Sequence, residues 1–379
     1  MPAFDLFMNP RHGTPGTVTL SAAGFRRAKA EISAWDGYAP TPLRDLAVPG
    51  TVRLKDESGR FGLGSFKALG GPYAVANLLA DVLSRLGLAA AASSADLASG
   101  RYAEATGAVT IASATDGNHG RAVAWAAARF GCRCAIYIHA TVSAAREAAI
   151  AAFGARVRRV HGTYDDAVRA CAQDAAREGW FVVSDTSWPG YTEIPRDIMQ
   201  GYRLMADEAA DQWNGPEPTH VFIQGGVGGA AAAVAAQTRA RWGRGPAVVV
   251  VEPDRAACLL ASARAGQVTA VPGELDTIMA GLACGEPSFL AWQELDRAAA
   301  AFMAISDAAA VDAMRFLAAH GIVSGESGVA GLAALQLARA DPAAAQNLGL
   351  RPDSRVLLFS TEGATDPALY RALIAGARR

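Results

Sequence analysis

The sequence has few cysteines and no arrangement of them that would hold a metal. Five occur in 379 residues, no two are spaced as CxxC, and none combines with histidine at the spacing of a zinc site. We therefore expect no metal site. In a reducing compartment we expect each cysteine to be a free thiol or a small buried hydrophobe.

An excess of charge is also absent, as are long apolar runs. The 35 basic and 36 acidic residues give a net charge of −1, so no surplus of positive charge indicates nucleic acid or an anionic membrane as a partner. The alanine-rich tracts are shorter than the roughly 18 apolar residues of a membrane span, and the N-terminus lacks the pattern of a secretion signal. These absences predict a cytoplasmic protein that binds neither nucleic acid nor membrane.

The sequence does contain an alternation of β-rich runs with helical segments. The β-rich runs are 51–56, 108–113, 134–139, 156–162, 180–185, 220–226, 247–253 and 355–361. Between them, apolar residues recur at helical spacing, and several of these segments end in glycine. The alternation predicts the α/β class with mainly parallel sheets, whose ligands lie at the carboxyl ends of strands. The length predicts two domains.

Lysine is rare, and one lysine has unusual neighbours. Of the three lysines, only Lys67 lies in an apolar, glycine-rich stretch, FGLGSFKALGG, whereas Lys29 and Lys55 have charged or polar neighbours. One interpretation is that Lys67 packs its stem on the core and keeps its amine in water. The other is that the amine is desolvated and forms a Schiff base with a carbonyl group. Lys67 alone does not decide between them.

Two loops that follow β-rich runs are typical of anion sites. After 108–113 the turn DGNHG places Asp116 and Asn118 where a helix begins, which suits a carboxylate ligand, although either residue can simply cap the helix. After 220–226 the loop GGVGG opens another helix and suits a phosphate.

The second loop has a competing interpretation. Gly226, Gly228 and Ala231 fit the dinucleotide fingerprint G-x-G-x-x-A, and Glu252 ends the next β-rich run, where a ribose-binding acid would lie. On this segment alone an NAD-linked oxidoreductase is as good an interpretation as a phosphate site. However, it leaves Lys67 and the DGNHG turn without a role. Pyridoxal phosphate gives a role to Lys67, to the DGNHG turn and to the glycine loop. It also gives a role to Ser360 or Thr361, whose hydroxyl could hydrogen-bond the pyridine nitrogen.

Six segments carry a family resemblance. They are YAPTPL (38–43), KDESGRFGLGSFKALGG (55–71), ATDGNHGRAVAWAA (114–127), SDTSWPGYTEIPRDIMQGY (184–202), GGVGG (225–229) and STEG (360–363). In this order they resemble the tryptophan synthase β-like, fold type II, pyridoxal phosphate enzymes, and within them the diaminopropionate ammonia-lyases. The resemblance implies two three-layer α/β domains with mainly parallel sheets. The larger, cofactor-binding domain would comprise 1–80 and 205–379, and the smaller would comprise 81–204 and close over the site.

The resemblance also implies roles for single residues. Lys67 would form the Schiff base and act as a base on one substrate enantiomer, with Asp116 the base on the other. Asp185 would contact the substrate, although it can equally cap the turn before TSWPG. The implied cofactor-binding residues are Lys67, Phe66, Asn118, Gly225, Gly226, Val227, Gly228, Gly229, Ser360 and Thr361.

Other residues receive weaker assignments. His119 is expected behind the site rather than as a base, and Tyr191 and Tyr202 are expected in packing, although either hydroxyl can reach the pocket. The sequence departs from the family at Gly64 and Ser65, where many relatives have asparagine and alanine. This departure leaves the lysine intact and concerns the fine shape of the pocket.

The reaction implied by the resemblance is α,β-elimination from 2,3-diaminopropionate, of either enantiomer, to pyruvate and ammonia in a homodimer. The alternatives are a serine, threonine or hydroxyaspartate dehydratase of the same fold, the oxidoreductase, and a binding protein of this fold without activity. A separate hypothesis is that Cys258 and Cys284, near the active-site entrance in this family, form a regulatory disulfide under oxidising conditions. Free thiols are the expected state in cytosol.

Overall fold

The computed structural model of the chain describes residues 4–115, 117–162 and 164–376. Its larger sheet has seven strands in the order β1-β10-β9-β8-β11-β3-β2. Their bounds are β1 (Phe4–Met8), β10 (Ala301–Ile305), β9 (Ala247–Pro253), β8 (His220–Gln224), β11 (Arg355–Ser360), β3 (Thr51–Asp56) and β2 (Leu43–Asp45). The five inner strands are parallel, and the edge strands β1 and β2 are antiparallel to their neighbours.

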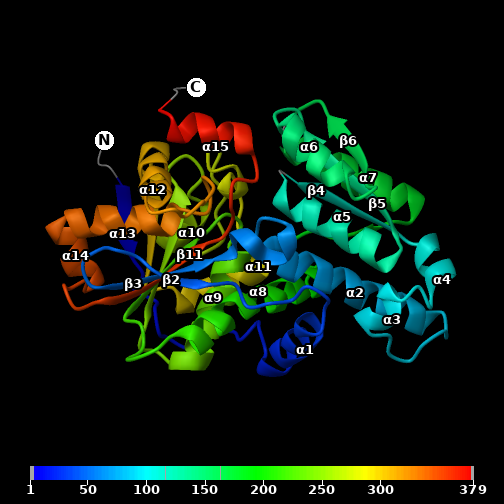
Figure 1. Cartoon of the computed structure of the whole chain (residues 1–379), viewed down its shortest axis with the longest axis horizontal. Coiled ribbons are helices and arrows are strands. Elements are labelled where there is room, and N and C mark those ends of the chain that lie inside the picture. The colour runs from blue at the N-terminus through cyan, green and yellow to red at the C-terminus, as the bar shows by residue number, and fades with distance from the viewer. Residues whose placement is uncertain (1–3, 116, 163, 377–379) are drawn as a thin grey trace.

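The smaller sheet has four parallel strands in the order β6-β5-β4-β7. They are β6 (Arg156–Val160), β5 (Arg133–His139), β4 (Thr110–Thr115) and β7 (Phe181–Val182). In Figure 1 this sheet and its helices lie to the right of the larger unit. Because β4 and β7 are neighbours and parallel, the loops that follow them leave the sheet at the same edge.

Helices cover both faces of each sheet. They are α1 (Ala22–Ser33), α2 (Lys67–Arg85), α3 (Ser94–Ala98), α4 (Ala103–Ala108), α5 (Asn118–Phe130), α6 (Ala144–Ala151), α7 (Tyr164–Glu178), α8 (Glu193–Gln212), α9 (Gly229–Trp242), α10 (Cys258–Ala265), α11 (Phe289–Ala298), α12 (Asp307–Ala319), α13 (Ala330–Ala340), α14 (Pro342–Leu348) and α15 (Pro367–Ile374), with 3-10 turns η1 (Glu57–Gly62) and η2 (Ala280–Leu282). Among the residues described here, no helix is long and apolar enough to cross a membrane.

Alternate side chains of one strand belong to different cores. On β8, Val221 and Ile223 pack in the core that includes α8 and α9, whereas Phe222 packs in the core that includes α12 and α13. In the smaller sheet, Ile111 faces the α5 side and Ala112 faces the α7 side. Each sheet is therefore the middle of three layers, which confirms the predicted fold class.

Helix α2 connects the two units. It packs against α8 of the larger unit and α5 of the smaller one, and Figure 1 shows it running between them. The apolar core is continuous along it, because Leu69 and Val75 belong to the same cluster as Ile223 and Ile136. Lys67 is the first residue of this helix, so its position is fixed by packing in both units.

The predicted domain boundaries both fall inside continuous helices. The boundary at 80/81 lies in α2 and that at 204/205 lies in α8. The strands of the smaller sheet span 110–182, and those of the larger sheet lie on either side of that range in the sequence. The exact boundaries stay predictions.

Candidate active site

The amine of Lys67 and the carboxylate of Asp185 form an ion pair across the two units. Lys67 begins α2, and Asp185 follows β7 of the smaller sheet. Their side chains are 19% and 16% exposed, so both are largely shielded from water but reachable. The Lys67 Nζ also lies 5.2 Å from the ring centroid of Phe66 and 5.5 Å from that of Tyr202. The other two lysines are engaged elsewhere, Lys55 with Glu208 and Lys29 with Asp207.

The pKa of Asp185 is well below its usual range. Burial acting alone would raise the pKa of this carboxyl, but the charge of Lys67, and after it that of His119, outweighs burial. Asp185 is therefore ionised at neutral pH and adds a fixed negative charge beside the amine. An anion held there favours any positive charge that a bound molecule carries or develops.

His119 lies behind Asp185. Its Nε2 is 2.9 Å from the carbonyl oxygen of Val183. Because a carbonyl only accepts, Nε2 must carry the proton in this contact. The Nδ1 of His119 lies 4.0 Å from the Asp185 carboxylate. This arrangement agrees with the prediction that His119 supports the site, and the role itself stays a prediction.

Asn118 begins α5 and donates from its side-chain amide to the carboxylate of Glu362. Glu362 also accepts from the backbone N–H of Ser327 at 3.0 Å and is 3% exposed. Glu362 belongs to the STEG segment, and no role was predicted for it. Asp116, the predicted second base, lies outside the described residues.

The GGVGG loop presents free backbone donors at the start of α9. The N–H groups of Gly226, Val227 and Gly229 donate to no group within the described part of the chain, although the loop is largely buried. Gly228 has φ +97°, and a Cβ there would lie 3.1 Å from Ala291. Unsatisfied donors at a helix N-terminus fit a phosphate group, so the loop suits the phosphate of pyridoxal phosphate.

The two hydroxyls after β11 are buried beside this loop. The Oγ of Ser360 donates to Ser324 Oγ at 2.7 Å, and the Oγ1 of Thr361 accepts from Gln224 Nε2 at 3.0 Å. Since the Thr361 hydroxyl accepts in that contact, its own proton remains to be donated. Neither hydroxyl is charged, so a ring nitrogen placed here would meet a neutral partner.

Glu252 is engaged in hydrogen bonds within the fold, which argues against the oxidoreductase interpretation. Its carboxylate accepts from the backbone N–H groups of Leu259 and Leu260, both at 2.8 Å, at the start of α10. The residue is fully buried, and burial raises its pKa to about 8. Its Cγ also occupies the space where a Cβ at Gly225 would lie, at 2.7 Å. Glu252 therefore supports the loop from behind and is not free to bind a ribose.

Cys258 and Cys284 are not bonded to each other in this structure. Cys258 is fully buried, and its Sγ donates to the carbonyl oxygen of Gly226 at 3.6 Å. Burial, followed by the charge of Glu252, raises the pKa of this thiol far above its usual value. A protonated thiol is a poor nucleophile, so exchange at Cys258 is disfavoured. The disulfide hypothesis concerns oxidising conditions and stays a prediction.

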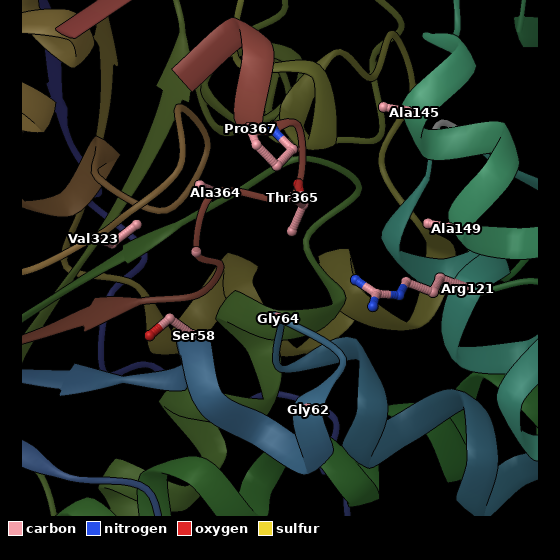
Figure 2. Close-up of a pocket in the computed structure, with 11 residues that line it drawn as sticks. Ser58, Gly62, Gly64, Arg121, Ala145, Ala149, Val323, Ala364, Thr365 and Pro367 are labelled. Carbon is pink, nitrogen blue, oxygen red and sulfur yellow. The ribbon is translucent and has the colours of Figure 1, made fainter. Parts of the chain in front are cut away.

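A cavity of about 530 Å³ lies between the two units. Figure 2 shows it bounded by Gly64, Thr365 and Pro367 of the larger unit and by Arg121 and Ala145 of the smaller one. Beside it, Arg146 of α6 contacts the buried Glu326 at 2.7 Å. No role was predicted from the sequence for Arg121, Arg146 or Glu326.

The class of this site is defined by comparison with known proteins. The family model of the pyridoxal-phosphate dependent enzymes matches residues 34–362, so the chain is an enzyme of that class with pyridoxal phosphate as its cofactor. A diaminopropionate ammonia-lyase of Escherichia coli is 42% identical over 359 residues, which cover 89% of this chain and 88% of the relative. The chain belongs to the diaminopropionate ammonia-lyase family.

Two solved structures of the Escherichia coli enzyme agree with this. The complex with D-serine has a TM-score of 0.89 and 38% identity, covering 98% of this chain and 96% of that one. The complex with an aminoacrylate-PLP azomethine reaction intermediate has a TM-score of 0.87 and 37% identity, covering 99% and 97%. These similarities confirm the predicted family, cofactor and PLP-dependent elimination. Which residue performs which step stays a prediction.

Proposed function

We propose that this enzyme eliminates ammonia from 2,3-diaminopropionate, of either enantiomer, and releases pyruvate and a second ammonia. With one water consumed, the atoms of the substrate are accounted for by one pyruvate and two ammonia molecules. The observation that carries the proposal is the ion pair of Lys67 and Asp185 beside the GGVGG loop. It brings together an amine for a carbonyl, a carboxylate for a positive charge and donors for a phosphate.

The cofactor-binding residues are part of this proposal. Pyridoxal phosphate, when bound, supplies an aldehyde for the substrate amine and withdraws electrons from Cα. In this proposal Lys67 holds the aldehyde, the loop from Gly225 to Gly229 holds the phosphate, and Ser360 or Thr361 faces the ring nitrogen. Phe66 and Asn118 lie beside the ring. The unsatisfied donors at Gly226, Val227 and Gly229 support the phosphate assignment.

Proton transfer is assigned to two side chains on opposite faces of the substrate. Lys67 takes the Cα proton of one enantiomer at Nζ, and Asp116 takes that of the other at its carboxylate. Asp185 keeps its negative charge next to Nζ and stabilises the substrate's β-ammonium until that group leaves as neutral ammonia. A β-hydroxyl carries no charge and gains less from Asp185. This difference supports diaminopropionate over serine.

The test is a panel of β-substituted amino acids with the purified holoenzyme. D- and L-diaminopropionate, D- and L-serine, threonine and 3-hydroxyaspartate are each assayed for 2-oxo acid and ammonia. We expect both enantiomers of diaminopropionate to exceed serine, threonine and hydroxyaspartate in kcat/KM. A hydroxy amino acid as the best substrate would contradict the proposal.

Lys67→Ala is the negative control for this panel of substrates. It should fold, lose covalently held cofactor and lose activity, because Lys29 and Lys55 are tied to Asp207 and Glu208. Borohydride reduction followed by peptide mass spectrometry identifies the labelled lysine. Label on Lys55 or Lys29 in the wild type would contradict the assignment of Lys67.

We also propose that the enzyme works as a cytoplasmic homodimer. The proposal rests on the resemblance of the sequence to the diaminopropionate ammonia-lyases. Sedimentation velocity and cell fractionation test the two parts. A monomeric active enzyme would contradict the first part, and recovery with the membrane fraction would contradict the second.

A further inference from the structure

The cavity between the two units carries an arginine to which neither the family resemblance nor the proposed mechanism gives a role. Arg121 lies on α5 three residues after Asn118, so the two side chains share a face of the helix one turn apart. The cavity it lines, of about 530 Å³, is within the size range of small-molecule sites. Figure 2 shows its guanidinium extending from α5 into this space, toward Gly64 and Thr365.

Gly64 lies between the side chains of Arg121 and Thr365. A Cβ at Gly64 would be 3.4 Å from Thr365 Cγ2 and 3.7 Å from Arg121 Nη1. Because glycine has no side chain, the space between Arg121 and Thr365 stays open. The same space would be partly filled by any larger residue at this position.

Arg121 has hydrogen-bond donors to spare. Within the part of the chain that the structure describes, it forms no ion pair, and its one hydrogen bond is from Nη1 to the carbonyl oxygen of Leu63 at 3.0 Å. Its Nε is buried without a partner, and so is the hydroxyl of Thr365. Burial lowers the pKa of Arg121. No acid among the described residues raises this pKa again.

The three carboxylates near the cavity that belong to the described residues are already engaged. Glu362 accepts from Asn118 and from the backbone of Ser327, Glu326 pairs with Arg146, and Asp366 accepts from the N–H of Leu369 at the start of α15. A guanidinium that is partly removed from water and pairs with no acid among the described residues is costly unless a ligand supplies the anion. The open space in front of Arg121 is where such an anion fits.

We propose that Arg121 is a recognition residue for the carboxylate of the small acid that enters this cleft. It holds that carboxylate in the outer cavity, one helical turn from Asn118, before the molecule moves inward to Lys67. The guanidinium presents parallel N–H donors that match the two oxygens of a carboxylate. For the amino-acid substrate this inference rests on the proposed function, because the acid recognised there is the substrate of that reaction.

The direct test uses pyruvate as a carboxylate probe and isothermal titration calorimetry of the holoenzyme. We expect Arg121→Gln to weaken pyruvate binding about tenfold or more, the loss that one hydrogen-bonded charge accounts for. Arg121→Lys, which keeps the charge, should recover part of the affinity. Arg129→Gln is the matched control, because Arg129 is a partly buried arginine on the same helix that lies 5.5 Å from the ring of Trp125. It should bind pyruvate like the wild type.

A second variant tests the open space rather than the charge. Gly64 has φ +76°, a conformation that asparagine tolerates better than most residues. Gly64→Asn should therefore fold, place its side chain between Arg121 and Thr365, and weaken pyruvate binding while Arg121 is still present. Each variant is accepted only if its cofactor absorbance and thermal midpoint match the wild type.

Kinetics separates this role from a purely structural one. With diaminopropionate, Arg121→Gln should raise KM about tenfold and leave kcat within about twofold, because the residue acts before the chemical step. Unchanged pyruvate affinity in Arg121→Gln, or an equal loss in Arg129→Gln, would overturn the inference. If the wild type does not turn over diaminopropionate, the proposed function fails, and the calorimetry still decides on Arg121.

Discussion

Asn118 and Glu362 are 244 residues apart in the chain, and their side chains share a hydrogen bond that joins the smaller unit to the larger one. The amide of Asn118 donates and the buried carboxylate of Glu362 accepts. The contact lies where α5 begins and just after β11 ends, at the carboxyl ends of both sheets. Like the Lys67–Asp185 ion pair, it is a polar link between the two units.

Exchanging the donor and acceptor tests this contact. Asn118→Asp should lower the thermal midpoint of the holoenzyme, because it places two carboxylates together in a buried position. Adding Glu362→Gln should restore much of the midpoint, since glutamine donates where asparagine did. We expect the double variant to be more stable than Asn118→Asp by differential scanning calorimetry. A double variant no more stable than the single one would mean that the contact contributes little.

The phosphate assignment can be tested at Gly229, which has room for a side chain. A Cβ there would meet nothing closer than Met199 Cγ at 3.7 Å, whereas Gly228 has positive φ and no space. Gly229→Ala should therefore bind pyridoxal phosphate nearly as well as the wild type. Gly229→Asp should weaken it by at least about tenfold, because it places a carboxylate at the donors meant for the phosphate. Titration of each variant with pyridoxal phosphate, followed by absorbance, measures the two affinities. Equal affinities of Gly229→Ala and Gly229→Asp would mean that the phosphate binds elsewhere.

Much of this architecture was predictable from local patterns, and the reasons are visible in single elements. The run 247–253 is β9 with the same bounds, and 355–361 is β11 with one residue more, because continuous valine and leucine runs are typical of strands buried on both faces. β10, Ala301–Ile305, was not predicted. It follows three alanines and begins with a fourth, and alanine-rich sequence favours helix over strand.

The site was predictable only in part, for a related reason. Lys67, Asn118, Asp185 and the glycine loop were named from motifs, because unusual residues in apolar or glycine-rich surroundings are visible in the sequence. Glu362 and Arg121 were not given roles, since their significance depends on partners far away in the chain or on the lack of one. Such tertiary contacts leave no local periodicity.

Glu252 predicts a pH dependence of stability. Burial raises its pKa to about 8 in the folded protein, above the unfolded value of 4.5, so the folded state holds a proton that the unfolded state has lost. Its contribution is complete below about pH 4.5 and is lost as the pH rises toward about 8. We expect the thermal midpoint to fall over this range, and Glu252→Gln to flatten the fall. The exposed Glu104→Gln is the control; identical slopes in both variants would contradict the account.

The two-base proposal predicts a stereochemical split. Asp116→Asn should remove most activity on one enantiomer of diaminopropionate, the D-form in our assignment, and spare much of the activity on the L-form. The reason is that each enantiomer presents its Cα proton to a different face, where only one of the two bases stands. Separate kcat/KM values for the two enantiomers decide the question. Equal losses on both would remove Asp116 as a face-specific base.

The central claim is that the carboxylate of Asp185 favours a β-ammonium over a β-hydroxyl. Its most direct test is the ratio of kcat/KM for L-diaminopropionate to that for L-serine, measured in the wild type and in Asp185→Asn. The account predicts that the ratio favours diaminopropionate in the wild type and drops by about tenfold or more in Asp185→Asn, because the variant removes a charge that acts on only one substrate. An unchanged ratio, or a wild type that prefers serine, would contradict it.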